Sequence, residues 1–564
     1  MFQITAELPF ALDLAFVSGL EADTDAERQH TESGKRAEGL TGSALNGLLQ
    51  QHEAAFDSRF KRTFGSFSAP GTPAGTAEVA KAALSNLLGS IGYFYGSSLI
   101  ALPPDRSGKP GQQSVVPSWD APLFTAVPSR SFFPRGFLWD EGFHQLLVRK
   151  WDRRLSRDIL AHWLDLMNSH GWIAREQILG AEARSRVPAD FVVQRPDSAN
   201  PPTLFLPLSD MASEVAADMA AELDPDPKRA AEVPGKGLRA SPAEQAAEAE
   251  FLLQAFPRLQ AWFGWFNATQ AGPVAHSYRW RGRDASTVRE LNPKTLTSGL
   301  DDYPRASHPT KEERHVDLRC WMALAASSLV SIGTHMGLPA HQVAPYQETV
   351  ALLGDVASLN ALHYDASRGQ YLDYGYHTED VSLKWMLQRA PDGGVVAREL
   401  RRMVGAPPKL QFVPHFGYVS LFPLLMGLLD KDSPELGQQL EHLRNPELLW
   451  TPYGLRSLSA TSSMHGKYNT EHDAPYWRGP IWMNLNFLTL RALHRYGQAG
   501  GKHAARAGQI YAELRSNVLR NMVEAYAQSG YLWENYDQAD GHGKGSHPFT
   551  GWTALLVLIG AESY

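Results

Sequence analysis

The chain has 564 residues, 43% of them hydrophobic and 20% charged, which is ordinary for a globular protein with a large buried core. Its formal net charge is −7 at pH 7 and it has no dense tract of Lys or Arg, so the charge pattern excludes any electrostatic support for a nucleic-acid partner. The single cysteine, Cys320, excludes an intrachain disulfide and a zinc site built from several cysteines, but it does not identify the compartment.

The first residues lack a basic region followed by an apolar one, so they do not form a signal peptide. The most apolar stretch, residues 552–561, is about half the length that a membrane-spanning helix needs. We therefore expect a soluble chain without a membrane span. Against this stands Asn267-Ala-Thr269, which fits the acceptor pattern for N-glycosylation, although such triplets also arise by chance.

In chain order, alternating apolar residues first predict two short strands at residues 2–8 and 12–17, which cannot stand alone. We interpret residues 1–20 as the remnant of an N-terminal β-sandwich. Residues 38–110 are predicted to be a helical linker region, with helical spacing at residues 44–64 and 79–95. Residues 111–564 then form one catalytic domain.

Helical spacing dominates from about residue 119 onward. The predicted helices cover residues 142–168, 316–336, 342–362, 417–429, 434–444, 481–496, 503–528 and 550–559, with a small hairpin at 365–374. Residues 212–250 are rich in Ala, Glu and Pro and contain no aromatic residue, which indicates a surface insertion, partly helical or disordered. Helices that alternate with long aromatic-rich loops favour a mainly α fold, a helical toroid with a site at one mouth, although periodicity does not distinguish a toroid from a bundle.

One carboxylate near the C-terminus, Glu534, lies among aromatic and turn residues in residues 531–538 and 545–552. Flat aromatic faces pack against sugar rings, and a neighbourhood of this kind also tunes the pKa of an acid. The pattern therefore predicts a sugar-cleaving site, which requires a second carboxylate facing Glu534.

Two loops offer candidates for the second carboxylate. Asp301 and Asp302 are adjacent in a loop too rich in Gly and Pro for a helix interior, and their repulsion, together with burial, would raise the pKa of Asp301 toward the range of a general acid. A solvated turn is the alternative interpretation of such a pair. Asp140 follows aromatic residues immediately before a predicted helix, where it could simply cap that helix.

Motifs for other chemistries are missing from the sequence. It contains no His-Glu-x-x-His, no EF-hand loop, no P-loop, no Gly-x-Gly-x-x-Gly and no Gly-x-Ser-x-Gly. The glycine-rich residues 541–546 favour a flexible loop, and Cys320 lies in an apolar helix as inert core. We expect no metal and no cofactor.

Several segments, in this order, closely resemble the processing α-glucosidase I enzymes, the mannosyl-oligosaccharide glucosidases of glycoside hydrolase family 63. The resemblance runs from about residue 1 to the end of the chain. The matching segments are Phe133-Pro-Arg-Gly-Phe-Leu-Trp-Asp-Glu-Gly-Phe-His144, Arg175-Glu-Gln-Ile-Leu-Gly-Ala-Glu-Ala-Arg184, Ser298-Gly-Leu-Asp-Asp-Tyr-Pro-Arg305, Glu313-Arg-His-Val-Asp-Leu-Arg-Cys-Trp321, Tyr476-Trp-Arg-Gly-Pro-Ile-Trp-Met-Asn484 and the Glu534 loop.

The resemblance implies an (α/α)6 toroid that removes the outermost α-1,2-linked glucose from the triglucosylated N-glycan precursor with inversion of the anomeric centre. It places the general acid at Asp301 and the general base at Glu534. The residues that it implies for substrate binding are Arg135, Trp139, Asp140, Glu141, His144, Glu176, Asp302, Arg305, Glu313, Arg314, His315, Asp317, Tyr476, Trp477, Arg478, Trp482, Trp533 and Tyr536. For the Tyr476 segment, a simple helix start with Pro480 in its first turn is the other interpretation.

The family works in the endoplasmic reticulum, which gives weight to glycosylation at Asn267 and implies that location for this chain. Its eukaryotic members carry a cytoplasmic tail, a membrane anchor and a nearly complete β-sandwich, whereas this chain begins near the last strands of that sandwich. We therefore expect either a truncated gene model or an anchorless form. The expected partner is the N-linked oligosaccharide of nascent glycoproteins, and the expected state is a monomer.

Two alternatives stay open at this point. A trehalase or a bacterial-type family 63 enzyme would share the toroid and act on a smaller α-glucoside, but it should lack the segments that begin at Arg175 and Glu313, which are both present. A non-catalytic glycan-binding relative would lose one catalytic carboxylate, whereas Asp301 and Glu534 are both in place.

Overall fold

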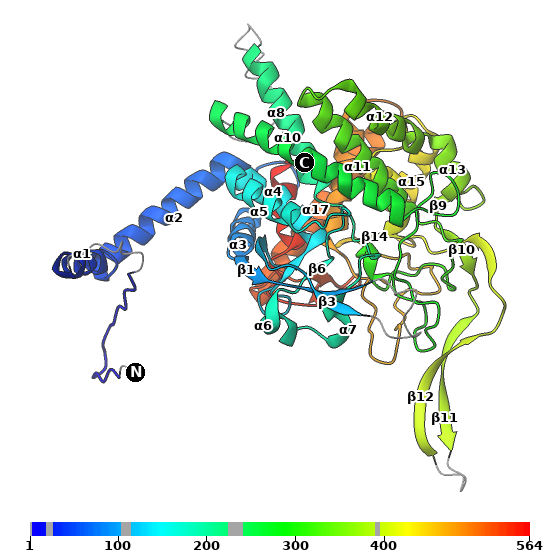
Figure 1. The fold of residues 1–564 in the computed structure, drawn as a ribbon, viewed down its shortest axis with the longest axis horizontal. Coiled ribbons are helices and arrows are strands. Elements are labelled where there is room, and N and C mark those ends of the chain that lie inside the picture. The colour runs from blue at the N-terminus through cyan, green and yellow to red at the C-terminus, as the bar shows by residue number, and fades with distance from the viewer. Residues whose placement is uncertain (1–2, 18–25, 103–113, 224–240, 390–394) are drawn as a thin grey trace. The chain divides into compact units, whose positions relative to one another are not determined.

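The computed structural model describes residues 3–17, 26–102, 114–223, 241–389 and 395–564. The chain divides into two compact units, Met1–Ser66 and Phe67–Tyr564 (Figure 1). In the first unit, helices α1 (Ala26–Gly39) and α2 (Gly42–Phe64) follow a stretch in which residues 3–17 form no strand. The alternation predicted strands there, but a strand needs a paired edge, and none of the described residues supplies one.

The second unit is built mainly from helices. Its longer helices are α3 (Thr76–Leu88), α4 (Leu138–Trp151), α5 (Arg153–Asp165), α8 (Phe205–Leu223), α10 (Pro242–Thr269), α11 (Val316–His335), α12 (Ala340–Gly354), α13 (Val356–His363), α15 (Pro434–Arg444), α16 (Met483–Gln498) and α17 (Ala504–Ser529). Shorter helical turns are α6 (Gly180–Ser185), α7 (Ala189–Val192), η1 (Leu296–Ser298), η2 (Tyr418–Leu421), α14 (Phe422–Leu425), η3 (Trp552–Leu555) and α18 (Leu556–Ala561).

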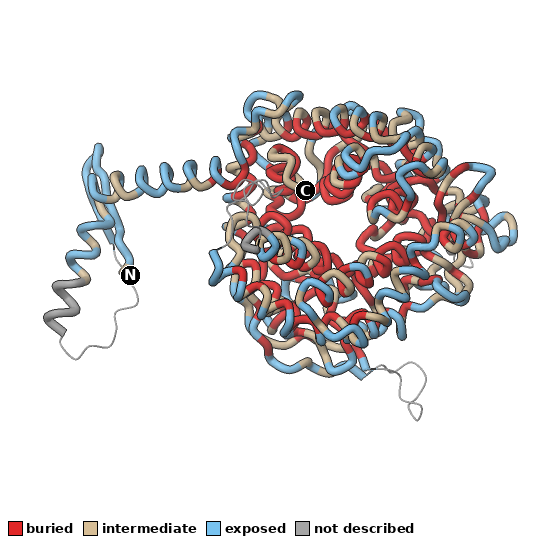
Figure 2. The backbone as a smooth tube through the Cα atoms, turned by 90° about the horizontal axis from the view of Figure 1, so that it is seen from above, coloured by how far each residue is buried: buried red, intermediate tan, exposed pale blue. Residues whose placement is uncertain are grey.

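Seen from above, the helices of the second unit form a ring, with buried residues along the helix faces that pack together (Figure 2). Helix α11 contacts α8, α10 and α12, and α16 packs against α17. Helix α11 is long and apolar enough, by length and composition, to cross a membrane. However, 78% of its most apolar stretch is buried inside the fold, as is typical of a helix that is apolar on nearly all sides. It is therefore a core helix of the ring.

Short antiparallel pairs edge the loops between helices. They are β1 (Ile91–Gly96) with β4 (Ala121–Ala126), β5 (Gly136–Phe137) with β6 (Glu176–Gln177), β8 (Tyr364–Asp365) with β9 (Gln370–Tyr371), β10 (Tyr374–His377) with β13 (Lys409–Phe412), β14 (Trp450–Thr451) with β15 (Gly454–Leu455), and β16 (Asn535–Tyr536) with β17 (Gly543–Lys544). In a three-stranded sheet, β2 (Leu99–Ala101) lies between β3 (Val115–Pro117) and β7 (Val193–Gln194). Several of these loops carry the site described below.

A longer ribbon, β11 (Val381–Arg389) paired with β12 (Val395–Val404), projects from the second unit (Figure 1). The predicted elements did not include it. Trp385 on this ribbon is 40% exposed, and the guanidinium of Arg398 lies 4.0 Å from its ring centroid.

Two of the regions in the predicted domain division can be compared with the described residues. Residues 67–110, predicted as linker, begin the second unit, where α3 packs against α17 and α18. The predicted insertion at 212–250 overlaps α8 and α10, while residues 224–240 lie outside the described residues. Arg149 of α4 forms ion pairs with Glu214 of α8 (2.5 Å) and Glu248 of α10 (3.3 Å). These contacts attach both helix segments to the ring of helices.

Candidate active site

The loop that carries Glu534 is held by the strand pair that follows it. The backbone N–H of Glu534 donates to the carbonyl of Ser546 (3.1 Å), and Tyr536 exchanges two backbone hydrogen bonds with Ile481 (2.8 and 2.9 Å). Gly545 has φ +78°, and a Cβ there would lie 2.5 Å from Oε2 of Glu534. Only glycine therefore lets this turn close against the carboxylate.

The Glu534 carboxylate is 5% exposed and has three hydrogen-bond donors. The hydroxyl of Tyr476 donates to Oε1, while the backbone N–H of Ser546 (3.0 Å) and its hydroxyl (3.2 Å) donate to Oε2. Burial raises the pKa of Glu534, and the bonds from Tyr476 and Ser546 oppose that rise. The three donors stabilise the ionised form of Glu534, which burial alone would disfavour.

The Asp301 loop follows the short helix η1. Gly299 has φ +76°, and a Cβ there would lie 2.7 Å from the ring of Trp139, so this turn also requires glycine. The carbonyl of Asp301 accepts a bond from the backbone N–H of Thr295 (2.8 Å), while its side chain remains 27% exposed. The backbone is fixed and the carboxyl group stays accessible.

Burial raises the pKa of Asp301 to about 7. The Arg175 guanidinium, 3.7 Å from Oδ1, opposes the rise in pKa, and the neighbouring Asp302 adds to it. The pKa of Asp301 is raised in the predicted direction, with burial as the largest cause and Asp302 as a contributor, and its role as the acid stays a prediction. A carboxyl whose pKa is raised in this way keeps its proton at higher pH than an exposed aspartate does, as a general acid requires.

Asp302 lies beside Asp301 but faces the protein. It is 4% exposed, and its carboxylate accepts the backbone N–H groups of Tyr476 (3.1 Å) and Trp477 (2.6 Å). The buried Arg478 donates to the carbonyl of Asp302 (2.7 Å). Asp302 and Arg478, both predicted to bind substrate, thus join two loops of the site to each other.

A chain of alternating charges reaches Asp301 from β5 and β6. Arg135 lies 2.7 Å from Oε2 of Glu176, whose Oε1 lies 2.9 Å from Arg175. Arg175 in turn approaches Asp301. Arg135 and Glu176 were predicted substrate-binding residues, and the structure links both to Asp301 through Arg175.

Asp140, in the first turn of α4, belongs to the same group of charges. It is 4% exposed, and burial raises its pKa well above the ordinary value. Arg175 lowers the pKa of Asp140, and the charges of Glu534 and Glu141 raise it further. The charges of Glu534, Asp301 and Asp140 all raise the pKa of the buried Tyr476, which makes that residue the common neighbour of the three carboxyls that form the acidic site.

Glu141 and His144, the other predicted residues at the start of α4, have partners within the fold. Glu141 Oε2 accepts from Thr125 (2.8 Å) and lies 3.1 Å from Nδ1 of His144, and Gln145 donates to Oε1. Both side chains are at most 1% exposed. These contacts fix the first turns of α4. Contact of Glu141 and His144 with substrate stays a prediction.

Four buried tryptophans form a cluster behind Tyr476. Trp477 and Trp482 stack with ring centroids 3.8 Å apart, while Trp139 and Trp552 meet edge to face at 5.4 Å. Trp482 Nε1 also donates to the carbonyl of Tyr476 (3.1 Å). Trp477 and Trp482 are at most 1% exposed, so the structure does not give either ring the open face that the predicted stacking on sugar needs.

Trp533 and Tyr536 lie close to Glu534 in sequence, and both side chains have partners within the fold. The ring of Trp533 lies 3.8 Å from that of His547, and its Nε1 donates to Ser529 (3.0 Å). The Tyr536 hydroxyl, fully buried, accepts the backbone N–H of Trp533 (3.2 Å). Both residues shape the loop that holds the carboxylate.

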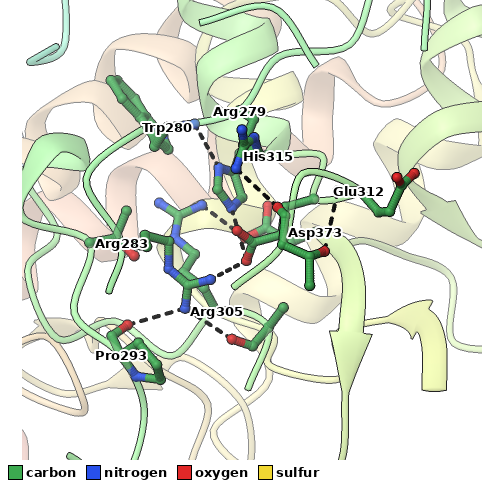
Figure 3. Close-up of polar contacts among 12 residues, drawn as sticks. Arg279, Trp280, Arg283, Pro293, Arg305, Glu312, His315 and Asp373 are labelled. Atoms are coloured by element: carbon green, nitrogen blue, oxygen red, sulfur yellow. Dashed lines mark hydrogen bonds and ion pairs between the residues drawn. The ribbon is translucent and has the colours of Figure 1, made fainter. Parts of the chain in front are cut away.

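Arg305, at the end of the Asp301 loop, is buried among carboxylates (Figure 3). Its guanidinium lies 2.6 Å from Asp317 and 2.9 Å from Asp373. Trp280 Nε1 donates to the two oxygens of Asp317 (3.1 Å each). Burial raises the pKa of Asp317, but Arg305 outweighs it and holds the net pKa below the ordinary value. The network fixes the end of the acid-bearing loop.

The remaining predicted residues surround that network. Arg283 pairs with Glu313. Nδ1 of His315 accepts the backbone N–H of Trp280 at 2.9 Å (Figure 3). The Arg314 guanidinium lies 4.0 Å from the ring centroid of Tyr374. The structure therefore collects Arg305, Glu313, His315 and Asp317 in a buried framework, and their contact with substrate stays a prediction.

Sequence reasoning missed three residues of the site. Arg175 precedes Glu176 in one of the segments quoted above, and Ser546 lies in the loop after Glu534. Their proximity to predicted site residues was the available signal. Lys294 lowers the pKa of Asp301 and lies 2.6 Å from Asp473, and no motif marked it.

Among the described residues, His377, Glu379 and His415 bring one potential metal-ligand atom each within 4.8 Å of one another. Nδ1 of His377 accepts the backbone N–H of Ser307 (3.2 Å), so Nε2 carries the proton of the neutral ring and donates to Glu379 (2.6 Å). A metal bound at Nε2 would require the ring proton to lie on Nδ1, where it would face the backbone N–H of Ser307. The contacts fit a hydrogen-bonded group better than a metal site.

A family model described as the glycosyl hydrolase family 63 C-terminal domain matches residues 40–562. The chain belongs to glycosyl hydrolase family 63. A similar family 63 protein, the mannosyl-oligosaccharide glucosidase GCS1 of Arabidopsis thaliana, is 48% identical over 100% of this chain and 63% of its own length. The mannosyl-oligosaccharide glucosidase of Saccharomyces cerevisiae is 34% identical over 97% of this chain and 64% of its own length. The chain thus spans less than two thirds of these two relatives.

The solved structure of a family 63 mannosylglycerate hydrolase from Thermus thermophilus aligns with a TM-score of 0.51 and 16% identity. The alignment covers 85% of this chain and 99% of that chain. At this identity the likeness concerns the fold alone. It confirms the predicted mainly α, toroidal family 63 fold.

Proposed function

We propose that this chain is an inverting exo-α-glucosidase that removes the terminal α-1,2-linked glucose of the triglucosylated high-mannose N-glycan precursor. The observation that carries the proposal is that two differently tuned carboxyls, Asp301 and Glu534, both act on the buried Tyr476. Asp301 has a pKa of about 7, and Glu534 is held as an acceptor by Tyr476 and Ser546. The names of the relatives from Arabidopsis and yeast, of which this chain spans less than two thirds, support the substrate.

In the proposed reaction, the Asp301 carboxyl donates its proton to the glycosidic oxygen as the bond to the anomeric carbon breaks. Glu534 accepts a proton from the water that attacks the opposite face of the sugar. Inverting enzymes hold these two groups about 6.5–9.5 Å apart to admit the water. The product is β-glucose, with a new hydroxyl on the shortened glycan.

The neighbouring charges have supporting parts in this proposal. Arg175 limits the rise in the pKa of Asp301, and Asp140 and Glu176 face the same acidic site as candidate partners for glucose hydroxyls. A buried carboxylate suits that task because it accepts hydrogen bonds from two hydroxyls on one sugar.

The proposed setting is the endoplasmic reticulum, where the substrate is attached to nascent glycoproteins, and the proposed state is a monomer. The family resemblance supports the setting. Asn267, on α10, is exposed, and the atom that Tyr278 bonds (2.7 Å) is its side-chain oxygen, whereas a glycan would be attached to the amide nitrogen.

The test is the release of glucose from a triglucosylated glycan by the purified chain, with the Asp301→Asn and Glu534→Gln variants alongside. We expect wild-type turnover and a loss of about 10²- to 10⁴-fold in kcat for each variant, because each removes one proton-transfer group. Circular dichroism of the variants controls for folding. Near-normal turnover by folded Glu534→Gln would exclude this residue as the base.

A further inference from the structure

A cavity lies beside β6, the strand that carries Glu176, and is lined by its second residue, Gln177. It has a volume of about 150 Å³ and is lined by β2, β3 and the segment between α5 and α6. Its lining includes Trp119, Trp172, Ser98, Asn168 and Gln177. This volume is below the roughly 300 Å³ of a site for an extended ligand, so it suits a single small ring.

The aromatic part of the lining is suited to a sugar face. Trp119 is 51% exposed, which leaves ring surface available. Trp172 is 5% exposed, and its Nε1 donates to the carbonyl of Ser198 (2.9 Å), which fixes the ring. Packing of a pyranose against such rings buries its apolar C–H face while its hydroxyls point to the rim.

The polar part of the lining offers both donors and acceptors. Ser98 is 3% exposed, and its hydroxyl has no hydrogen-bond partner among the described residues. Asn168 uses its oxygen to accept the backbone N–H groups of His170 and Trp172 (3.0 Å each), so its amide N–H groups are the part left for a ligand. An unpaired buried hydroxyl is costly unless a ligand or water satisfies it.

The cavity is coupled by geometry to the acidic site. In β6, Glu176 forms an ion pair with Arg135 and belongs to the group of charges that includes Asp301. The next residue, Gln177, lines the cavity. Successive side chains of a strand point to opposite faces, so the two sites share one short strand as a wall. A branched oligosaccharide with one end in the acidic site has further sugar units to reach such a neighbour.

We propose that this cavity binds one hexose unit of the oligosaccharide, separate from the glucose that is cleaved. The inference rests on the proposed function for the identity of the oligosaccharide. A hexose fits the lining because the tryptophan ring takes its apolar face, and Ser98 and Asn168 take its hydroxyls. Gln177 adds its side-chain oxygen as an acceptor, since its Nε2 already donates to the carbonyl of Ala174 (3.0 Å). Binding there holds the long substrate without touching the reacting bond.

The experiment compares a long and a short substrate in the full chain. Trp119→Ala and Ser98→Ala are assayed on the triglucosylated high-mannose glycan and on an α-1,2-linked glucose disaccharide. For the glycan we expect KM to rise about tenfold in Trp119→Ala, the effect of losing one aromatic contact, with kcat unchanged. Activity on the disaccharide should stay within about twofold of wild type, since it reaches only the acidic site.

The matched control is Trp385→Ala, which removes another exposed tryptophan, this one from the β11–β12 ribbon. It should change the kinetics on neither substrate. Equal KM values for wild type and Trp119→Ala on the glycan, or equal losses on both substrates, would overturn the proposal and leave the proposed function standing.

A binding measurement separates the two proposals if the wild-type chain cleaves neither substrate. Methyl α-D-mannopyranoside is titrated into wild type, Trp119→Ala and Trp385→Ala while tryptophan fluorescence is recorded. We expect a saturable change in wild type and Trp385→Ala that disappears in Trp119→Ala. Identical traces for wild type and Trp119→Ala would refute the cavity as a hexose site, whatever the catalytic result.

Discussion

The hydroxyl of Tyr476 donates a hydrogen bond to the carboxylate of Glu534. The backbone N–H of the same tyrosine donates to Asp302, beside the acid candidate Asp301 (3.1 Å). One residue therefore touches the base and the loop of the acid, although 58 and 174 positions of sequence separate it from those two partners. The relative placement of the two proton-transfer groups depends on this connection.

Tyr476→Phe should raise the pKa of Glu534, because the lost hydrogen bond stabilised its anion. The base must be ionised, so the acidic limb of the kcat profile should move to higher pH. We expect kcat at the optimum to fall about tenfold or more, the usual effect of a bond to a charged group. The measurement is kcat against pH, with exposed Tyr531→Phe as the control. An unshifted acidic limb would speak against the Tyr476 contact.

Arg175→Gln should raise the pKa of Asp301 above about 7, because the guanidinium opposes the effect of burial. The acid must be protonated, so activity falls as pH rises through the pKa of Asp301. The alkaline limb of the profile should therefore move to higher pH in this variant. Arg258→Gln, on the surface, serves as the control. An alkaline limb that moves to lower pH would contradict the assignment of Asp301 as the acid.

Gly299→Ala should disturb the acid-bearing loop without removing any charged group. The new Cβ would lie 2.7 Å from the Trp139 ring at a φ of +76°, which L side chains rarely adopt. We expect a drop in kcat and a lower Tm, measured together by glucose release and thermal unfolding. Gly264→Ala, on the surface of α10 with no atom within 4 Å of its Cβ, is the control. Wild-type kcat in Gly299→Ala would mean that the loop tolerates displacement.

Asp317→Asn should lower the free energy of unfolding by about 3–5 kcal/mol, because it removes one partner from a buried charge pair. Arg305 would keep Asp373 but lose its shortest ion pair, 2.6 Å long. Urea unfolding measures the change. Asp165→Asn, whose ion pair with Arg258 is largely exposed, should cost about 0–1 kcal/mol. Equal effects of the two substitutions would show that the Arg305 network does not stabilise the fold.

Helix positions could be predicted from the sequence where local signals are strong. Residues 434–444 match α15, which Ser433 caps and Pro434 begins. The β11–β12 ribbon was missed although Pro391-Asp-Gly-Gly394 separates two apolar runs, a common hairpin signal. The start of α10 was also missed, although Ser241 and Glu244 form a capping box.

The site was predictable only in part. The residues around Glu534 indicated carbohydrate chemistry, and the family resemblance supplied the roles of the two carboxyls. Nothing local distinguished Asp301 from Asp302, because the difference comes from Arg175 on one side and from the backbone of Tyr476 and Trp477 on the other. Contacts between residues this far apart in sequence depend on the tertiary fold.

The central claim is that Asp301 and Glu534 act as an inverting pair. Proton NMR of the first glucose released from the triglucosylated glycan tests it most directly, because the anomeric signals of α- and β-glucose are separate before mutarotation. The account predicts β-glucose as the first product. Release of α-glucose first would contradict it.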